Sequence, residues 1–253
     1  ENYGKKFYGP STLRKGIENS RNLMTIRIAQ YLGMEKVAEI ANRTGIMENM
    51  PNVLSMALGA GETSLIDLTA AYASFVNGGK KVEPSLIDRI QDRRGKNIFL
   101  ENFAACTNCD EPYIEENPMP KLVNSSESIF DEAKSYQMVS ILKGAVDRGT
   151  GRKTKIDGIE IAGKTGTTNN NTDAWFIGFT SDLIIGVYAG FDKPKSLGKR
   201  ETGSSVAVPI FRDFVKNYYQ DKPILPFTIP NGIELIKINY DTGEIAVSYT
   251  HLT

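Results

Sequence analysis

Five consecutive residues bring a cation, three hydroxyl groups and a glycine together: Lys164-Thr165-Gly166-Thr167-Thr168. They end a stretch, 159–168, whose composition predicts a β-strand. At a sheet edge, the missing side chain of Gly166 would let an extended peptide pair with the backbone. The hydroxyls of Thr165 and Thr167 can bind a carboxylate, which the Lys164 ammonium would attract, and the Thr167 N–H can face an oxyanion. A plain threonine-rich strand with a glycine bulge has the same composition.

A second polar group, Ser20-Arg21-Asn22, lies between two stretches of helical periodicity, 11–19 and 23–32. Residues two apart do not face each other on a helix, so Ser20 and Asn22 could act together only on the turn between the helices. A serine hydroxyl can relay a proton, and a carboxamide can hold a peptide group. Serine and asparagine are also favoured N-cap residues, which is the structural alternative for both.

The composition excludes several classes of function. The chain has 253 residues, with Lys plus Arg and Asp plus Glu both numbering 30, and this zero balance argues against nucleic-acid binding. The only histidine, His251, is near the end, so we expect no Ser-His-Asp machinery. We expect no cofactor and no metal, since Cys106 and Cys109 supply two of the four ligands of a structural zinc. For this pair we favour a local disulfide in an oxidising compartment or two idle thiols.

Periodicity predicts an α+β chain in which helices come first and strands come last. No apolar run approaches the ~20 residues of a membrane span, and the chain begins at Glu1 without a signal segment, so we expect a piece of a longer protein. Strands at 159–168, 174–180 and 183–191 are expected to form an antiparallel meander. Segment 104–124 is predicted to be a loop. Further helices are expected at 37–43, 64–76, 128–146 and 206–219. Hairpins are expected at 81–100 and 233–247.

The two polar motifs stand in the order of a known signature. A Ser-Asp-Asn-type motif and Lys-Thr-Gly, preceded by Ser-x-x-Lys, characterise penicillin-interacting serine enzymes. With them, the chain resembles the transpeptidase domain of class A, bifunctional penicillin-binding proteins, from about residue 3 to about residue 220. The other stretches that resemble this family are Gly9–Arg14, Ala57–Glu62, Leu68–Ala73, Asn77–Gly79, Gly144–Val146, Gly149–Gly151 and Asp173–Gly178.

The resemblance implies a penicillin-binding/serine β-lactamase-like fold, with an antiparallel sheet flanked by helices and incomplete at its N-terminal side. It implies a transpeptidase domain over 1–222, followed by a linker and small hairpin over 223–253. The acylated serine of the family lies in a Ser-x-x-Lys motif upstream of Ser20. The chain has two such patterns, Ser140–Lys143 and Ser196–Lys199, and both lie after Ser20, in the wrong order. We therefore expect the chain alone to lack the nucleophile and to be inactive.

The resemblance also implies roles and partners. Ser20 would pass a proton to the leaving nitrogen, Asn22 would hold the substrate amide, and Lys164 would tune Ser20 and attract the carboxylate bound by the 165–168 segment. The partners would be peptidoglycan stem peptides ending in D-Ala-D-Ala, and β-lactams. The site would lie on the periplasmic face of the bacterial inner membrane. The protein would be attached to that membrane only by an anchor outside these residues. A penicillin-sensing receptor domain and a serine β-lactamase or D,D-carboxypeptidase are the alternatives.

Overall fold

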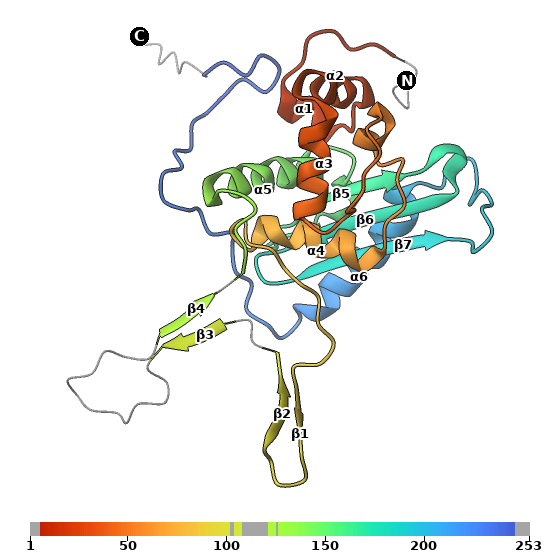
Figure 1. Cartoon of the computed structure of the whole chain (residues 1–253). Coiled ribbons are helices and arrows are strands. Elements are labelled where there is room, and N and C mark those ends of the chain that lie inside the picture. The colour runs from red at the N-terminus through yellow and green to blue at the C-terminus, as the bar shows by residue number, and fades with distance from the viewer. Residues whose placement is uncertain (1–5, 102–103, 108–120, 125, 246–253) are drawn as a thin grey trace, which may run out of the picture.

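The computed structural model describes residues 6–101, 104–107, 121–124 and 126–245, and for 104–107 and 121–124 it describes the backbone alone. A three-stranded sheet with helices on both faces makes up the body, and two β-ribbons extend from it (Figure 1). The α-helices are α1 (Leu13–Glu18), α2 (Asn22–Leu32), α3 (Met34–Arg43), α4 (Leu65–Val76), α5 (Glu132–Asp147) and α6 (Val208–Tyr218). Short turns of helix are η1 (Leu54–Leu58), η2 (Arg152–Thr154), η3 (Asn169–Asn171) and the π-helical η4 (Gly203–Ala207).

The sheet that carries the lysine motif is an antiparallel meander in the order β5-β6-β7. Its strands are β5 (Ala162–Thr167), β6 (Asp173–Phe179) and β7 (Ile184–Gly190), so the expected meander is confirmed. Within the described part of the chain, β5 pairs with β6 alone and is an edge strand. Because side chains alternate along a strand, Lys164 and Gly166 share one face of the sheet, and Thr165 and Thr167 share the other.

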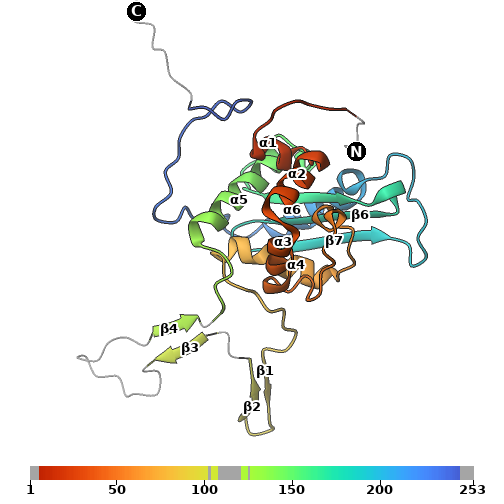
Figure 2. The ribbon, with the colours of Figure 1, turned by 45° about the horizontal axis from the view of Figure 1, so that its top comes forward.

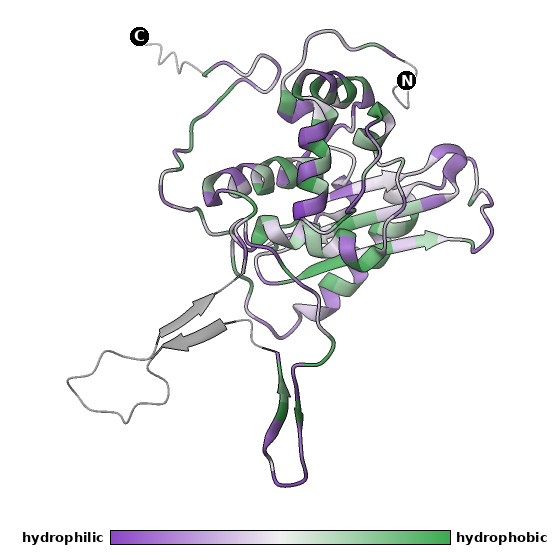
Figure 3. Cartoon of the chain, viewed as in Figure 1, coloured by the Kyte–Doolittle hydropathy of each residue, from purple (hydrophilic) through white to green (hydrophobic). Residues whose placement is uncertain are grey.

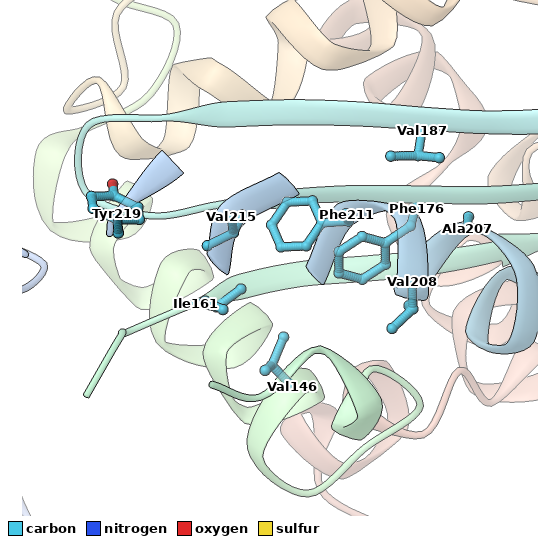
Figure 4. Close-up of a cluster of buried hydrophobic side chains, with 9 residues drawn as sticks. All are labelled: Val146, Ile161, Phe176, Val187, Ala207, Val208, Phe211, Val215 and Tyr219. Atoms are coloured by element: carbon cyan, nitrogen blue, oxygen red, sulfur yellow. The ribbon is translucent and has the colours of Figure 1, made fainter. Parts of the chain in front are cut away.

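Both faces of the sheet are covered by helices. On the Thr165 face, α6 and η4 bury a cluster in which the Phe176 and Phe211 rings meet edge to face, 4.9 Å apart (Figure 4). On the Lys164 face, α4 and α5 pack around Ala162 and Phe179, which close a second cluster. Each fully buried phenylalanine contributes about 1.5–3 kcal/mol relative to an exposed one. The sheet edge that carries Lys164 is therefore held in a rigid, two-sided core.

The first helix, α1, lies beside the C-terminal half of α5, as both views of the ribbon show (Figure 2). α1 packs directly on α5, and α2 follows α1 after a three-residue turn, Asn19–Arg21. This packing brings the turn to the edge of the sheet. The Thr12 hydroxyl caps α1 by accepting the Lys15 N–H.

Two antiparallel ribbons leave the body. β1 (Arg89–Gln91) pairs with β2 (Asn97–Leu100) around a turn containing Gly95, as predicted, although 81–88 is not strand. β3 (Ala104–Thr107) pairs with β4 (Lys121–Asn124), so the prediction of loop throughout 104–124 is wrong at both ends. Cys106 pairs with Leu122 in that ladder, while Cys109 lies outside the described residues. The apolar residues on β1 and β2 are exposed (Figure 3).

Other predicted elements shift at their boundaries. α3 begins at Met34 rather than at residue 37, and α5 begins at Glu132, where the Asp131 side chain caps it, rather than at residue 128. Up to residue 245, the predicted C-terminal hairpin is reduced to a turn with one bridge, Ile238 to Ile245. No helix among the described residues is long and apolar enough to cross a membrane.

Candidate active site

The side chains of Lys164 and Ser20 meet, although they come from opposite ends of the chain. The Lys164 Nζ donates a hydrogen bond to the Ser20 Oγ over 2.9 Å and another to the Thr165 carbonyl oxygen over 3.0 Å. Ser20 is exposed and Lys164 is half-buried, so the pair borders solvent. The turn between the first two helices and the edge strand of the sheet therefore form one site.

Lys164 is an unusual cation. Burial lowers its pKa from 10.5 to about 8, and desolvation is the only cause of this shift. A lysine with this pKa still carries its proton at neutral pH, and it releases that proton more readily than a surface lysine does. Its ammonium can therefore both attract an anion and exchange a proton with the Ser20 hydroxyl.

Ser20 lies in a strained backbone position. The Ser20 N–H donates to the Ile17 carbonyl and the Arg21 N–H donates to the Gly16 carbonyl, which together form a Schellman motif at the end of α1. The residue at the left-handed position of that motif is commonly glycine, but here it is Ser20, with φ 53°. Strain of this kind persists where the surrounding structure enforces it, and it is common at functional sites.

Asn22 is the first residue of α2, two residues beyond Ser20. The N-cap of α2 is Arg21, and no side chain caps this helix end. The alternative of a capping role for Asn22 is therefore wrong. Asn22 lies in the first turn of α2, one residue beyond the inter-helix turn on which the sequence places both residues, and Ser20 lies on that turn.

Thr165 is held from the opposite face of the sheet. Its hydroxyl lies 2.7 Å from the Thr150 hydroxyl, and the Thr150 N–H donates to the Glu18 carbonyl over 3.1 Å. Thr150 follows the end of α5, and Glu18 ends α1. Neither residue has a predicted role from the sequence, although Thr150 lies in one of the stretches that resemble the family.

Gly166 and Thr167 are approached by the π-helical turn η4. The Gly203 N–H donates to the Thr167 Oγ1 over 3.1 Å. A Cβ at Gly203 would lie 2.6 Å from the Gly166 carbonyl oxygen, so glycine is needed here. Gly166 faces the Trp175 side chain: a Cβ added at Gly166 would lie 3.1 Å from the Trp175 Cβ. η4 thus packs on the Thr165–Thr167 face of β5, against the backbone of Gly166, while the outer edge of β5 pairs with no described strand.

Thr168 behaves differently from the other residues of the motif. Its hydroxyl contacts the Thr172 hydroxyl at 2.7 Å and the Asp173 carboxylate at 2.9 Å, and it accepts the Asp173 N–H. The Tyr188 hydroxyl donates to the same carboxylate over 2.9 Å. These bonds order the β5–β6 connection, and Thr168 is separate from the Lys164–Ser20 contact.

The two out-of-order Ser-x-x-Lys patterns lack the geometry of a nucleophile. The Ser140 Oγ accepts a hydrogen bond from the Arg14 guanidinium over 3.1 Å, and Lys143 pairs with Glu160. The Ser196 Oγ accepts the Gly198 N–H in the loop after β7. In neither pattern does a described hydrogen bond join the serine to its lysine, so neither hydroxyl is hydrogen-bonded to a general base that could activate it. The described residues also contain no group of three His, Cys, Asp or Glu side chains able to hold a metal ion.

Comparison with known proteins agrees with these motifs. The model of the penicillin binding protein transpeptidase domain family matches residues 1–216. The chain is 46% identical to penicillin-binding protein 1A of Rickettsia conorii, over 97% of this chain and 31% of that protein. It is 33% identical to penicillin-binding protein 1A of Pseudomonas aeruginosa, over 96% of this chain and 34% of that protein. The chain thus spans about a third of the length of these relatives.

Solved structures of low sequence identity share the fold. The crystal structure of penicillin-binding protein 1A from Haemophilus influenzae superposes with a TM-score of 0.83 at 29% identity, over 98% of this chain and 40% of that one. The PonA1 protein of Mycobacterium tuberculosis superposes with a TM-score of 0.72 at 20% identity, over 97% of this chain and 64% of that one. The fold is that of penicillin-binding transpeptidase domains, α+β with an antiparallel sheet flanked by helices. With the family model matching 216 of 253 residues, the chain belongs to the penicillin-binding protein transpeptidase domain family.

Proposed function

We propose that this chain forms two walls of a serine D,D-transpeptidase site that cross-links peptidoglycan stem peptides. The substrate is a stem peptide ending in D-Ala-D-Ala, and a β-lactam binds as its mimic. The Lys164–Ser20 hydrogen bond carries the proposal, because it joins a proton relay to an edge of β5 that pairs with no described strand and that an extended peptide can pair with. Membership of the transpeptidase family supports the same reaction.

The chemistry would divide among five side chains. Ser20 gives its proton to the nitrogen of the departing D-Ala and takes one from the Lys164 ammonium, so the relay ends with a neutral lysine. Asn22 holds the substrate amide from the first turn of α2. Thr165 and Thr167 bind the terminal carboxylate, and the Thr167 N–H faces the oxyanion. Gly166 keeps the strand edge open, and Thr168 orders the connection that follows it.

The attacking serine is not among these groups. In the family signature it belongs to a Ser-x-x-Lys motif that precedes the Ser20 motif, and none of residues 1–19 forms one. We assign to this chain the protonation of the leaving D-Ala nitrogen and the binding of the terminal carboxylate of the substrate. The reaction takes place where peptidoglycan is built, at the cell envelope. We also keep 1–222 as the domain and 223–253 as its extension.

Ligand binding by the chain itself tests the proposal. Trp175, the only tryptophan, lies beside Gly166 on the Lys164 face and serves as a fluorescent reporter. We expect N-acetyl-Lys-D-Ala-D-Ala to change its emission with saturation, and the C-terminal amide of the same peptide to bind at least about tenfold more weakly. Lys164→Met should abolish that preference, whereas Lys199→Met, at an exposed loop lysine, should keep it. Equal binding of acid and amide would contradict the proposal.

A further inference from the structure

A fully buried carboxylate lies behind the Ser20 turn. The Glu18 side chain has no exposed surface, yet it ends α1, where a negative charge opposes the helix dipole. The Arg148 Nη2 lies 2.6 Å from its Oε1, and the Arg14 Nη1 lies 3.5 Å from the same oxygen. A buried charge of this kind is tolerated only when it is paired. Helix stability therefore does not explain Glu18.

Two glycines leave room for this residue. A Cβ at Gly144, inside α5, would lie 1.8 Å from the Glu18 Oε1, and a Cβ at Gly149 would lie 2.0 Å from the Glu18 carbonyl oxygen. Glycine within a helix costs about 0.5–1 kcal/mol relative to alanine. The glycine at position 144 therefore makes α5 less stable than an alanine would, and it leaves the space that the Glu18 carboxylate occupies.

Glu18 connects to both halves of the site. Toward the first half, Ser20 lies two residues further along the same Schellman turn, whose hydrogen bonds begin at Gly16 and Ile17. Toward the second half, the Glu18 carbonyl accepts the Thr150 N–H, and the Thr150 hydroxyl contacts that of Thr165. One residue therefore sets the positions of the proton relay and of the threonine strand.

The C-terminal segment covers the same place. The Tyr240 hydroxyl accepts a hydrogen bond from the Asn19 side chain over 3.2 Å, and Asp241 pairs with Lys15. The Arg148 guanidinium lies over the Tyr240 ring, 5.4 Å from its centre. Burial and then a hydrogen bond with Glu18 raise the pKa of Tyr240. The turn 239–243 thus helps to cover the Glu18 carboxylate, while the Arg148 side chain stays partly exposed.

We propose that Glu18, anchored by Arg148 and covered by Tyr240, is a positioning residue that holds the Ser20 turn in register with the Lys164–Thr165 strand. Only the expected effect on peptide binding rests on the proposed function. The claim about geometry stands on the contacts alone: a carboxylate with no role in the reaction fixes the separation of the two walls of the site.

The test compares Glu18→Gln with Glu160→Gln in the whole chain. Both variants remove the carboxylate of an ion pair with a residue on or just after α5, but the described partners of the Glu160 carboxylate are Lys143 and the Phe227 N–H, not residues of the Ser20 turn. Three quantities are measured: amide exchange at Arg21 and Thr150, the Lys164 pKa by NMR of 13C-methylated lysines, and the peptide dissociation constant. For Glu18→Gln we expect about tenfold faster exchange at both amides, a Lys164 pKa raised by ~0.5 as water enters, and about tenfold weaker binding.

Arg148→Lys keeps the protein testable if Glu18→Gln does not fold, because Arg148 is 47% exposed. Arg148 donates to Glu18 from both Nε (3.3 Å to Oε2) and Nη2 (2.6 Å to Oε1). Lysine retains the charge but cannot make both contacts, so we expect the same three changes at smaller size. Unchanged exchange and unchanged Lys164 pKa in a folded Glu18 or Arg148 variant would overturn the proposal, and so would equal changes in Glu160→Gln. If the wild-type chain binds no peptide, the proposed function fails, while exchange and the Lys164 pKa still decide the positioning role.

Discussion

The Lys164 ammonium and the Ser20 hydroxyl, 144 positions apart in the chain, share a 2.9 Å hydrogen bond. Two independent structural units meet at this bond. The Schellman turn after α1 holds the hydroxyl, and the edge strand β5 holds the ammonium. The bond is therefore sensitive both to the state of the lysine and to the backbone of the serine, and each can be changed separately.

The low pKa of Lys164 predicts a pH-dependent stability. Its folded-state pKa is about 8 and its ordinary value is 10.5, so between these values the unfolded chain binds more protons than the folded chain. The cost of burying the charge is therefore fully present below pH 8 and is relieved as the pH rises toward 10.5, by at most about 1.4 kcal/mol per pH unit. Urea unfolding at pH 7 and pH 9.5 should show the wild type gaining stability relative to Lys164→Met. A constant difference would contradict the shift.

The left-handed backbone of Ser20 predicts that its replacement by glycine separates stability from function. A non-glycine residue in this conformation is strained by about 1–2 kcal/mol, so Ser20→Gly should be about 1 kcal/mol more stable than Ser20→Ala. Neither variant has a hydroxyl. We expect the measured pKa of Lys164 to change in both, because both lose one of the two described hydrogen-bond acceptors of its ammonium. Denaturant midpoints that rank alanine above glycine would show that the turn is not strained.

Covalent penicillin labelling should fail with this chain alone. The proposed chemistry assigns no attacking serine to residues 1–253, and Ser140 and Ser196 have no base within the hydrogen bonds described above. A fluorescent penicillin followed by denaturing electrophoresis should leave the chain unlabelled. Labelling that is lost in Ser140→Ala or Ser196→Ala would make that serine the nucleophile, and labelling that survives both would indicate another one.

The contact of Gly203 with the sheet predicts a costly substitution. In Gly203→Ala the new methyl group would lie 2.4 Å from the Trp175 carbonyl oxygen and 2.6 Å from that of Gly166. We expect a loss of about 1–3 kcal/mol in the free energy of unfolding, together with altered Trp175 fluorescence as η4 moves. Ser204→Ala, in the same π-helical turn, is the matched control and should change both measurements little.

The regular elements around the site were predictable, and its fine geometry was not. Hydrophobic periodicity located the β5–β7 meander and the helix after Ser64, because both pack against one core. The serine at a left-handed position was not predictable, since that position commonly takes glycine. The interpretation of Asn22 as an N-cap failed because Arg21 occupies that position without a side-chain cap.

Charged residues were the hardest to interpret. A sequence containing Glu18 and Arg148 gives no sign that one carboxylate is fully buried, because buried glutamates are rare and their partner here is 130 positions away. The 104–124 segment shows the opposite problem. Its prolines and asparagines favour a loop, yet the residues at its ends pair as β3 and β4.

The glycine at 144 limits how this protein can be engineered. Replacing helix glycines with alanine is a standard route to greater thermal resistance, since it restricts the denatured chain and favours helical backbone. On α5 the same exchange would drive a methyl group into an oxygen of Glu18. We therefore expect Gly144→Ala to destabilise the protein rather than to stabilise it. The substitution would be tolerated only together with a smaller side chain at position 18, at the end of α1.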